Sequence, residues 1–277
     1  MAPPLGELSA ELTERGTGVA LSASLCSAPL PEGEASNVVK DFNMLEKLLE
    51  SGLEELGVEY DARTLERYRI YFENLEETNK VMNLTAISGE EDVARLHFLD
   101  CAAVLKMEDF KGKRIIDVGT GAGFPGLAMK IAQPDMELVL LDSLDKRINF
   151  LRDSCAKMGI DDVKCIHARA EEIPEGYRES FDFAVSRAVA RLNLLCELCL
   201  PYVKKGGAFI AMKGQEMDTE IKEAYTAIKT MGAVVEKKID YPIPGTDIVH
   251  KAVVLRKVSD TPKKYPRRWA QIKKSPL

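Results

Sequence analysis

Apolar residues recur along most of the chain with the spacing of helices or of buried strands. Residues 1–35 are the exception, because they are rich in Ala, Pro, Ser, Gly and Leu without sustained periodicity. We expect them to form a disordered leader, or to be a remnant foreign to the natural protein. Helical spacing begins after them, with Leu45, Leu48 and Leu49 on one face of a helix predicted over 37–56.

Two further helices complete a predicted N-terminal helical appendage over 36–110. The first is expected over 62–82, where apolar residues again share one face. The second begins at Ser88 and Glu91, which have the spacing of a capping box, and runs to about Met107.

Short apolar runs then alternate with helical stretches, which is the pattern of a doubly wound α/β domain, predicted here over 111–258. The last two runs are joined by too few residues for a crossover helix, so these strands should be antiparallel. A basic tail is expected over 259–277. Strands are predicted at 114–118, 137–142, 163–167, 181–185, 208–213, 233–241 and 248–257. One helix is predicted to begin at residue 145, a second to end at residue 200 and a third to span 216–231, with a turn at Gly206-Gly207.

A glycine-rich stretch follows the first predicted strand and reads Asp117-Val-Gly-Thr-Gly-Ala-Gly-Phe-Pro-Gly126. Gly119, Gly121 and Gly123 would let the backbone turn sharply and approach a ligand closely. Pro125 is expected at the first position of the next helix. The free N–H groups of that helix could then hold a nucleotide-like cofactor.

Three interpretations of this loop are open: a site for S-adenosyl-L-methionine, a dinucleotide site and a purely structural turn. Gly121, Gly123 and Gly126 match the dinucleotide pattern G-x-G-x-x-G. S-adenosylmethionine is favoured because the glycines start earlier, at Gly119, and because Asp117 would repel a pyrophosphate but can face an ammonium or sulfonium group. The Gly-Lys-Ser/Thr ending of a nucleoside triphosphate loop is missing.

Three later positions are candidates for the same site. Asp142 ends the second strand, 23 residues after Gly119, where a carboxylate can accept from both ribose hydroxyls. Glu171, beside Ala170, could bind an adenine amino group, or it could simply complement a helix dipole. Arg187 follows the fourth strand, at the edge of the sheet where substrates bind.

Two other groups of residues are candidates for a functional site. His97 and Asp100 are three residues apart and share a helix face, where histidine is more often a core residue than a catalyst. Cys196 and Cys199 form a C-x-x-C, but no second pair follows and the surrounding run is apolar, so we expect core packing and no metal. No apolar run approaches the 18 to 20 residues or so that span a membrane, and no secretory signal is evident; the expected location is the cytoplasm.

The charge of the chain is unevenly distributed. The net charge is −6, yet the residues from Arg256 to the C-terminus hold eight basic side chains and one acid, which leaves −13 on the remainder. A basic tail on an acidic body is typical of a contact arm for phosphates, although it could be a merely solvated tail. Tyr265 and Trp269 lie within it and could stack on bases.

The order of these motifs resembles the bacterial RsmG family, also called glucose-inhibited division protein B, from about residue 40 onwards. The strand series resembles the Rossmann-like, seven-stranded S-adenosylmethionine-dependent methyltransferase fold, with a mostly parallel sheet and an antiparallel last strand. The chain departs from the family at Arg95-Leu96-His97, where many relatives place the arginine directly before the histidine, and at Arg268-Trp269-Ala270, where a Gly/Pro-rich segment is common. The motifs are Asn83-Leu-Thr85, Arg95-Leu-His-Phe-Leu-Asp100, Asp117 to Gly126, Leu141-Asp-Ser-Leu-Asp-Lys-Arg147, Ser186-Arg-Ala188 and Thr261-Pro-Lys-Lys-Tyr-Pro-Arg267.

The resemblance implies methylation of guanine N7 in 16S ribosomal RNA, with naked RNA or the small-subunit particle as partner and S-adenosyl-L-methionine as cofactor. It implies that Asn83, His97 and Arg187 lie at the reacting centre. Gly119, Phe124, Ala170, Glu171 and Arg187 would contact the cofactor. We expect a monomer that binds neither membrane nor metal. A dinucleotide-dependent oxidoreductase and a non-catalytic RNA-binding protein are the alternatives.

Overall fold

The computed structural model describes residues 44–187 and 190–277, so the predicted leader lies outside the described residues. The strands are β1 (Arg114–Val118), β2 (Glu137–Asp142), β3 (Val163–His167), β4 (Phe181–Arg187), β5 (Val203–Lys213), β6 (Ala233–Pro242) and β7 (Val249–Lys257). The helices are α1 (Met44–Leu56), α2 (Ala62–Met82), α3 (Glu90–Val93), η1 (Ala94–Leu99), α4 (Asp100–Ala103), η2 (Val104–Lys106), α5 (Gly126–Ala132), α6 (Asp145–Lys157), α7 (Leu192–Cys199), η3 (Leu200–Tyr202), α8 (Met217–Glu223), α9 (Tyr225–Thr230) and α10 (Trp269–Lys274).

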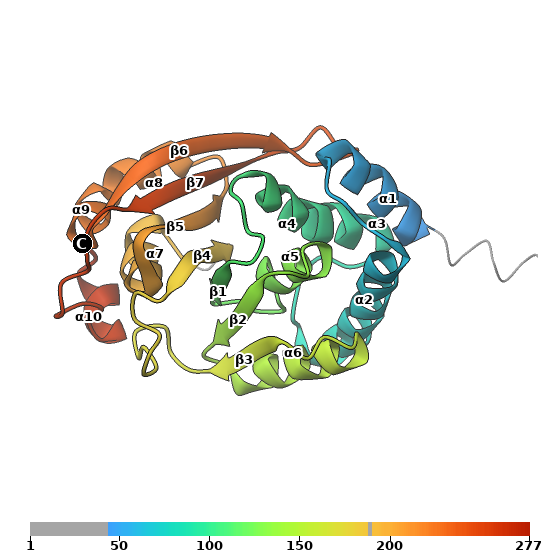
Figure 1. The fold of residues 1–277 in the computed structure, drawn as a ribbon, viewed down its shortest axis with the longest axis horizontal. Helices are drawn as coiled ribbons and strands as arrows, with labels where there is room; N and C mark the ends of the chain where they lie inside the picture. The colour runs from blue at the N-terminus through green and yellow to red at the C-terminus, as the bar shows by residue number, and fades with distance from the viewer. Residues whose placement is uncertain (1–43, 188–189) are drawn as a thin grey trace, which may run out of the picture. The chain divides into compact units, whose positions relative to one another are not determined.

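The seven strands form one sheet in the order β3-β2-β1-β4-β5-β7-β6 (Figure 1). The strands β1 to β5 pair in parallel, whereas β7 is antiparallel to both of its neighbours, β5 and β6. This arrangement confirms the predicted α/β class, with its mostly parallel sheet and antiparallel last strand. The chain reverses its strand order between β1 and β4, which places a ligand-binding edge above these strands.

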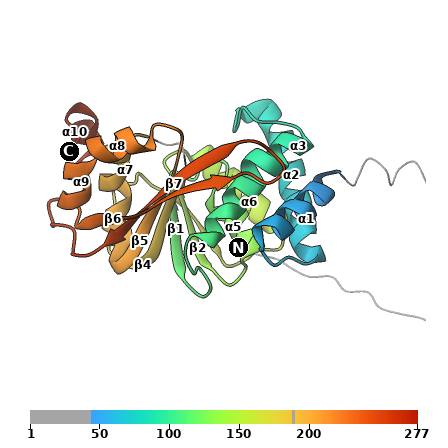
Figure 2. The ribbon, with the colours of Figure 1, turned by 90° about the horizontal axis from the view of Figure 1, so that it is seen from above.

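Side chains on successive strand residues point to opposite faces of the sheet, and each face carries its own core. In β1, Ile115 belongs to the core under α1 to α6, while Ile116 belongs to the core under α7 to α10. Figure 2 shows these two groups of helices on the two sides of the sheet. Because both faces are covered, β1, β2 and β4 are buried at most of their positions.

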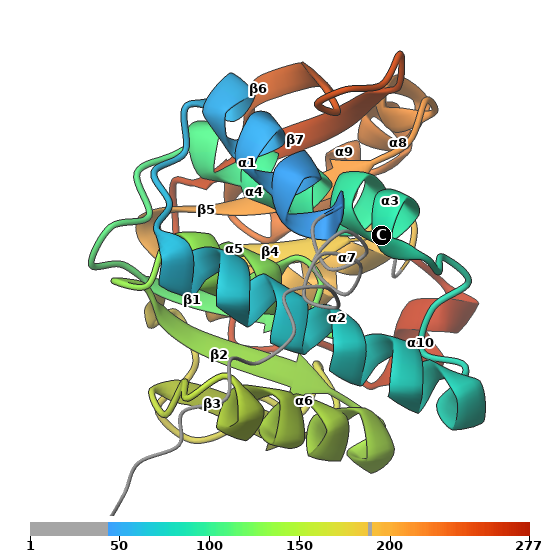
Figure 3. The same ribbon diagram turned by 90° about the vertical axis from the view of Figure 1, so that its right-hand side faces the viewer.

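The N-terminal helices share a core with the first face of the sheet. The long helix α2 begins at Asp61, whose carboxylate accepts a hydrogen bond from the Thr64 amide at 2.8 Å. It packs against α5 and α6 (Figure 3), and the Tyr68 hydroxyl donates to the carbonyl of Ala128 at 2.8 Å. The helices before β1 therefore hold the helix that follows the glycine loop.

Several local predictions were wrong. Gly206-Gly207 is not a turn before β5 but lies within it, and a side chain at Gly207 would collide with the carbonyl of Asp182. Pro125 precedes α5 instead of beginning it. The helix predicted over 216–231 divides at Ala224 into α8 and α9. The helix predicted up to Met107 is also irregular, because η1 is a turn of π-helix, a form that is frequent at functional sites.

The predicted basic tail is folded onto the rest of the chain. Lys257, the last residue of β7, is buried, and its ammonium group donates to the Glu179 carboxylate at 2.9 Å and to the hydroxyl of Thr261 in the tail at 2.8 Å. Arg267 pairs with the buried Glu197 of α7, so these two basic groups have internal partners. Tyr265 is also buried and is not free to stack on RNA bases. The exposed basic residues of the tail are Lys263, Lys264, Arg268, Lys273 and Lys274.

Candidate functional site

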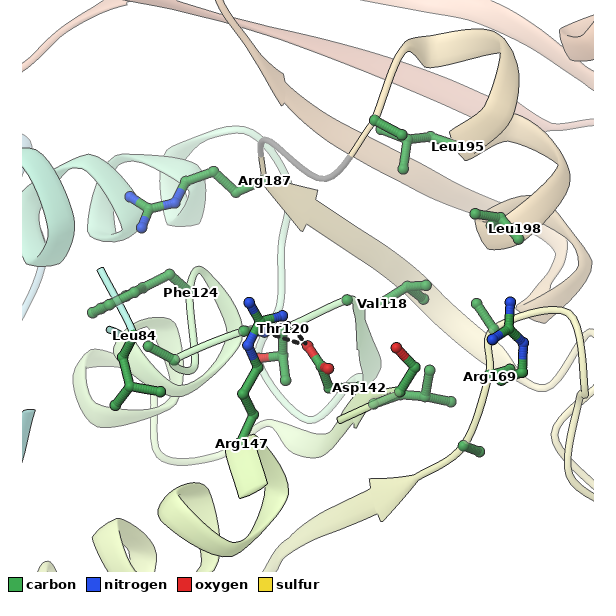
Figure 4. A pocket seen from close by; sticks show the side chains of 18 of the residues that line it. Leu84, Val118, Thr120, Phe124, Asp142, Arg147, Arg169, Arg187, Leu195 and Leu198 are labelled. Atoms are coloured by element: carbon green, nitrogen blue, oxygen red, sulfur yellow. Dashed lines mark hydrogen bonds and ion pairs between the residues drawn. The ribbon is translucent and has the colours of Figure 1, made fainter. Parts of the chain in front are cut away.

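A cavity of about 590 Å³ lies at the carboxyl ends of β1, β2 and β4 (Figure 4), a size usual for small-molecule sites. Of the residues predicted for the site, Asn83, Asp117 and Gly123 do not line it. The other predicted residues do line it: His97, Gly119, Gly121, Phe124, Asp142, Ala170, Glu171 and Arg187.

Only part of the glycine loop lines the cavity: Gly119 and Gly121 do, and Gly123 does not. Gly119 and Gly121 adopt positive φ angles of 73° and 63°, and a side chain added at Gly121 would meet no atom within 4 Å. Gly123 has a φ of 103°, but a side chain there would collide with the Tyr71 hydroxyl. Gly121 therefore leaves open space for a ligand, whereas Gly123 lets α2 approach the loop.

Asp117 does not face the cavity, contrary to our expectation that it would meet an ammonium or sulfonium group. Its side chain is fully buried beneath the loop, where one carboxylate oxygen accepts from the Thr120 hydroxyl at 2.7 Å and the Gly126 amide at 2.8 Å. The other oxygen has no hydrogen-bond partner among the described residues. Burial raises the pKa of Asp117 to about 7. The residue thus supports the loop from below.

Asp142 lies at the centre of the cavity wall and is 3% exposed. Its carboxylate accepts from the amides of Gly121 at 3.0 Å and Leu144 at 2.9 Å, and the Arg147 guanidinium lies 3.3 Å away. These contacts join β2 to the glycine loop and fix the carboxylate in the cavity. A carboxylate has about four lone-pair sites, so acceptor capacity is left for a ligand's hydroxyls.

One end of the cavity is formed by His97, Phe124 and Arg187. The imidazole of His97 stacks on the Phe124 ring with centroids 4.3 Å apart, and the Arg187 guanidinium lies 4.8 Å from the same ring. His97 Nδ1 lies 2.9 Å from Arg187 Nη2, which can only donate, and 3.1 Å from the Leu96 carbonyl oxygen, which can only accept. The shorter contact favours Nδ1 as the acceptor, and Nε2 then carries the proton toward Thr85 Oγ1, 2.8 Å away. Burial and the neighbouring Arg187 charge lower the pKa of His97 to about 3. His97 is therefore neutral at physiological pH.

Asp100 anchors this end from behind. Its carboxylate accepts from Arg187 Nη1 at 3.1 Å, from the Tyr241 hydroxyl at 2.9 Å and from His250 Nδ1 at 2.9 Å. The hydrogen bond to Asp100 raises the pKa of His250. The network thus links η1 and α4 to β4, β6 and β7, and it fixes the guanidinium of Arg187 above Phe124.

The opposite end of the cavity is mainly apolar. Leu195 and Leu198 of α7 line it together with Ala170, and Trp269 of α10 completes the wall. Glu171 lies beside them with its carboxylate 2.6 Å from Arg169 Nε. In Figure 4, Leu195, Leu198 and Arg169 lie on one side of Val118 and Asp142, while Phe124, Arg187 and Leu84 lie on the other.

Some lining residues were missed from sequence, and one predicted residue lies elsewhere. Leu84 and Thr85 reach the cavity, whereas their neighbour Asn83 ends α2 in a left-handed conformation with a φ of 48°. The motif around Asn83 could have indicated Thr85. Arg95, where the chain departs from the family pattern, does not line the cavity and donates to the carbonyls of Pro244 and Gly245 in the β6–β7 loop.

The cysteine pair in α7 is part of the core, as expected. Cys196 and Cys199 are fully buried, and burial raises the pKa of both thiols. In the described ranges, no group of three or more His, Cys, Asp and Glu residues is placed to hold a metal ion. No helix within the same ranges is long and apolar enough to cross a membrane.

The cavity fits a cofactor that combines a nucleoside with a charged amino-acid tail. The open space above Gly121 admits a ligand close to the backbone, and Asp142 offers acceptors where ribose hydroxyls would lie. An apolar end and a polar end flank this centre.

Comparisons with known proteins agree with this architecture. A family model described as rRNA small subunit methyltransferase G matches residues 64–241. Ribosomal RNA small subunit methyltransferase G of Lachnoclostridium phytofermentans is 44% identical over 229 residues, which cover 82% of this chain and 95% of the relative. The protein of the same name from Alkaliphilus oremlandii is 45% identical over 236 residues, covering 84% and 99%. A branched-chain polyamine synthase variant from Thermus thermophilus, solved with 5′-methylthioadenosine, shares the fold at 14% identity and a TM-score of 0.53. The match covers 72% of this chain and 66% of the synthase chain.

Proposed function

Because the chain belongs to the rRNA small subunit methyltransferase G family, we propose that it methylates N7 of a guanine in 16S ribosomal RNA. The family and the S-adenosylmethionine-dependent methyltransferase fold are those expected from the sequence motifs. The observation that carries the choice of N7 is the neutral, hydrogen-bonded His97 beside Arg187 at the polar end of the cavity. The family is a methyltransferase family by name, so we propose neither the dinucleotide-dependent oxidoreductase nor the non-catalytic RNA-binding protein.

The glycine loop and Asp142 would hold S-adenosylmethionine across the centre of the cavity. Asp142 would accept from the ribose hydroxyls, and the backbone at Gly119 and Gly121 would lie against the ligand. Ala170 and Glu171 would contact the adenine, and Phe124 and Arg187 the end that carries the methyl group. When bound, the cofactor supplies a methyl group on a positively charged sulfur. Asp117 would act only through the loop that it supports.

The residues at the polar end suit a nucleophile that needs no base. Guanine N7 already has an in-plane lone pair and no proton to lose, so the enzyme must mainly position and desolvate it. His97 stays neutral and would orient the base, because its low pKa makes it too weak a base to take up a proton near pH 7. Asn83, which the resemblance places near this centre, lies outside the cavity and would act only indirectly.

Arg187 has donors left for the substrate. Its Nη1 donates to the Leu96 carbonyl and to Asp100, and one Nη2 hydrogen points to His97. Nε and the second Nη2 hydrogen have no protein partner among the described residues. Arginine donors commonly bind guanine O6 and N7. We infer that Arg187 donates to O6 and thereby presents N7 to the methyl group.

The decisive experiment is single-turnover methyl transfer to naked 16S RNA and to small-subunit particles, followed by mapping of the modified atom. We expect methylation at guanine N7 and none on an exocyclic amine or a ribose. Modification of another atom would refute the proposal. Saturating S-adenosylhomocysteine should raise the melting temperature, whereas NAD should not. Size-exclusion chromatography would test the expected monomer, and activity on ribosomal RNA implies the cytoplasm.

A further inference from the structure

The segment after β7 is anchored to the protein by buried polar contacts. The Arg267 amide and guanidinium both bind the Glu197 carboxylate, each at 2.7 Å, and Glu197 is 1% exposed. From the other side, Arg178 donates to the carbonyls of Thr261 and Tyr265, each at 2.8 Å. A buried carboxylate that would be unpaired without Arg267 makes this attachment costly to break.

This anchor determines where the following helix lies. The short helix α10 packs against α7, and its Ile272 is fully buried in the core beneath α7. Trp269, the first residue of α10, is half-buried and packs against the same core. Trp269 is thereby held against the cavity, where it lines the wall together with Leu195 and Leu198 of α7.

The surroundings of Trp269 favour a flat aromatic ligand at the apolar end of the cavity. Leu195 and Leu198 are buried and present apolar surface, and the indole adds a broad planar face. The polar residues His97 and Arg187, where we have proposed that the methyl acceptor enters, lie at the other end of the same cavity. A ring at the apolar end is therefore part of the cofactor and not of the RNA base that reacts.

We propose that Trp269 packs against the adenine of S-adenosylmethionine, so that the C-terminal segment forms part of the cofactor site. The proposal rests on the cofactor orientation proposed above. Aromatic side chains stack on any base because every base has a π face. The tail thus has two separate parts: Arg267 attaches it through Glu197, and Trp269 contributes to the cavity.

The most direct test uses intrinsic fluorescence, because Trp269 is the only tryptophan in the chain. Titration of the wild-type protein with S-adenosylhomocysteine or with adenosine should quench the indole emission with saturation. Homocysteine alone should leave the emission unchanged, since it lacks the ring. Quenching by RNA fragments but not by either adenosine compound would place the indole on an RNA-binding surface and overturn the proposal.

Calorimetry on variants provides a second readout. Trp269→Ala should raise the Kd for S-adenosylhomocysteine about tenfold, which is about 1.4 kcal/mol. Trp269→Phe should stay within about threefold of wild type, because it keeps an aromatic face. Tyr225→Ala is the matched control, since Tyr225 is an exposed aromatic residue that does not line the cavity, and it should leave the Kd unchanged.

These measurements separate this proposal from the proposed function. If the wild-type protein binds no S-adenosylhomocysteine, the assigned cofactor is wrong. If the wild type binds it without fluorescence change and Trp269→Ala binds equally well, only the role of Trp269 is refuted. The fluorescence titration needs no substitution, so it decides the question even if Trp269→Ala fails to fold.

Discussion

The two ends of the cavity are built differently. At the polar end, His97, Asp100 and Arg187 hold one another through hydrogen bonds, and Asp100 takes further bonds from residues more than 140 positions away in the chain. At the apolar end, Leu198 and Trp269 present surfaces with few directional contacts. Loss of one member of a buried polar network leaves the other members unpaired, whereas loss of an apolar surface costs in proportion to its area. The polar end should therefore be the less tolerant.

The largest expected effect is that of Asp100→Ala. This change leaves the largely buried Arg187 without its carboxylate, and breaking a buried pair in this way typically costs about 3 to 5 kcal/mol of unfolding free energy. Urea denaturation would measure the loss. The control is Asp218→Ala, which breaks the exposed pair with Lys238 and should leave the stability close to that of wild type. Equal effects of the two changes would mean that the network does not hold the polar end.

Asp142→Ala tests the residue between the two ends. If Asp142 accepts from the ribose, the variant should bind S-adenosylhomocysteine about 1 to 3 kcal/mol more weakly, as for a charged hydrogen bond left unmade. Calorimetry would give the affinity, and circular dichroism would verify the fold, because Asp142 also accepts from Gly121 and Leu144. Asp145→Ala removes a nearby exposed carboxylate outside the cavity and should bind normally. Unchanged affinity in Asp142→Ala would exclude the ribose role.

The polar end should also respond to pH. The pKa of His97 is about 3 in the folded protein and about 6.5 when unfolded, so the unfolded state binds the proton first as the pH falls. Stability should therefore decline below about pH 6.5, by about 1.4 kcal/mol at pH 5.5 from this group alone. His250 has a raised pKa and acts in the opposite sense, with a contribution that is lost as the pH rises through its folded pKa.

His97→Gln isolates the contribution of His97 to the pH dependence of stability. The amide keeps an acceptor for Arg187 and a donor for Thr85 but does not titrate in this range. The difference in unfolding free energy between wild type and variant should change between pH 7.5 and 5.5, as measured by urea denaturation at each pH. A difference that is constant over this interval would show that His97 is not held neutral.

The sequence predicted those parts of the site that depend on local patterns. The strands, the glycine loop and Asp142 follow from short apolar runs and from the residues directly after them, and each is found near its predicted position. The direction of Asp117 beneath the loop could not be predicted, because Thr120 and Gly126 capture its carboxylate only once the loop has folded. A side chain at Gly126 would lie 2.8 Å from Asp117, which shows how closely the helix approaches.

Other features depend on contacts between distant segments. Tyr265 was expected on an exposed arm, but Glu197 and Arg178 attach the tail and thereby bury it. Glu197 lies 70 positions before its partner Arg267, and Arg178 lies 87 positions before its partner Tyr265. The spacing of apolar residues within one segment cannot predict contacts of this kind. The same contacts bring Trp269 to the cavity. The basic composition of the tail predicted RNA binding, whereas the position of Trp269 at the cavity became apparent only from the path of the folded tail.

The smallest expected effect concerns that folded tail. Lys273 and Lys274 are exposed in the last turn of α10, the short helix that begins with Trp269. Replacing them leaves Ile272, the buried residue of this helix, unchanged. The double change Lys273→Gln with Lys274→Gln should weaken RNA binding by less than about 1 kcal/mol per residue, as for exposed charges. The slope of log affinity against log salt should fall by about 0.7 to 0.9 for each phosphate contact that is lost.

Cofactor affinity should be unchanged in this double variant, because neither lysine lines the cavity. Filter binding to 16S RNA fragments at several salt concentrations would give the slope, and calorimetry would give the Kd for S-adenosylhomocysteine. Lys238→Gln is the control, because it removes one exposed positive charge from β6, half of the charge removed by the double variant. If the tail variant loses cofactor affinity but keeps the wild-type salt slope, α10 acts only on the apolar end of the cavity and the basic tail is merely solvated.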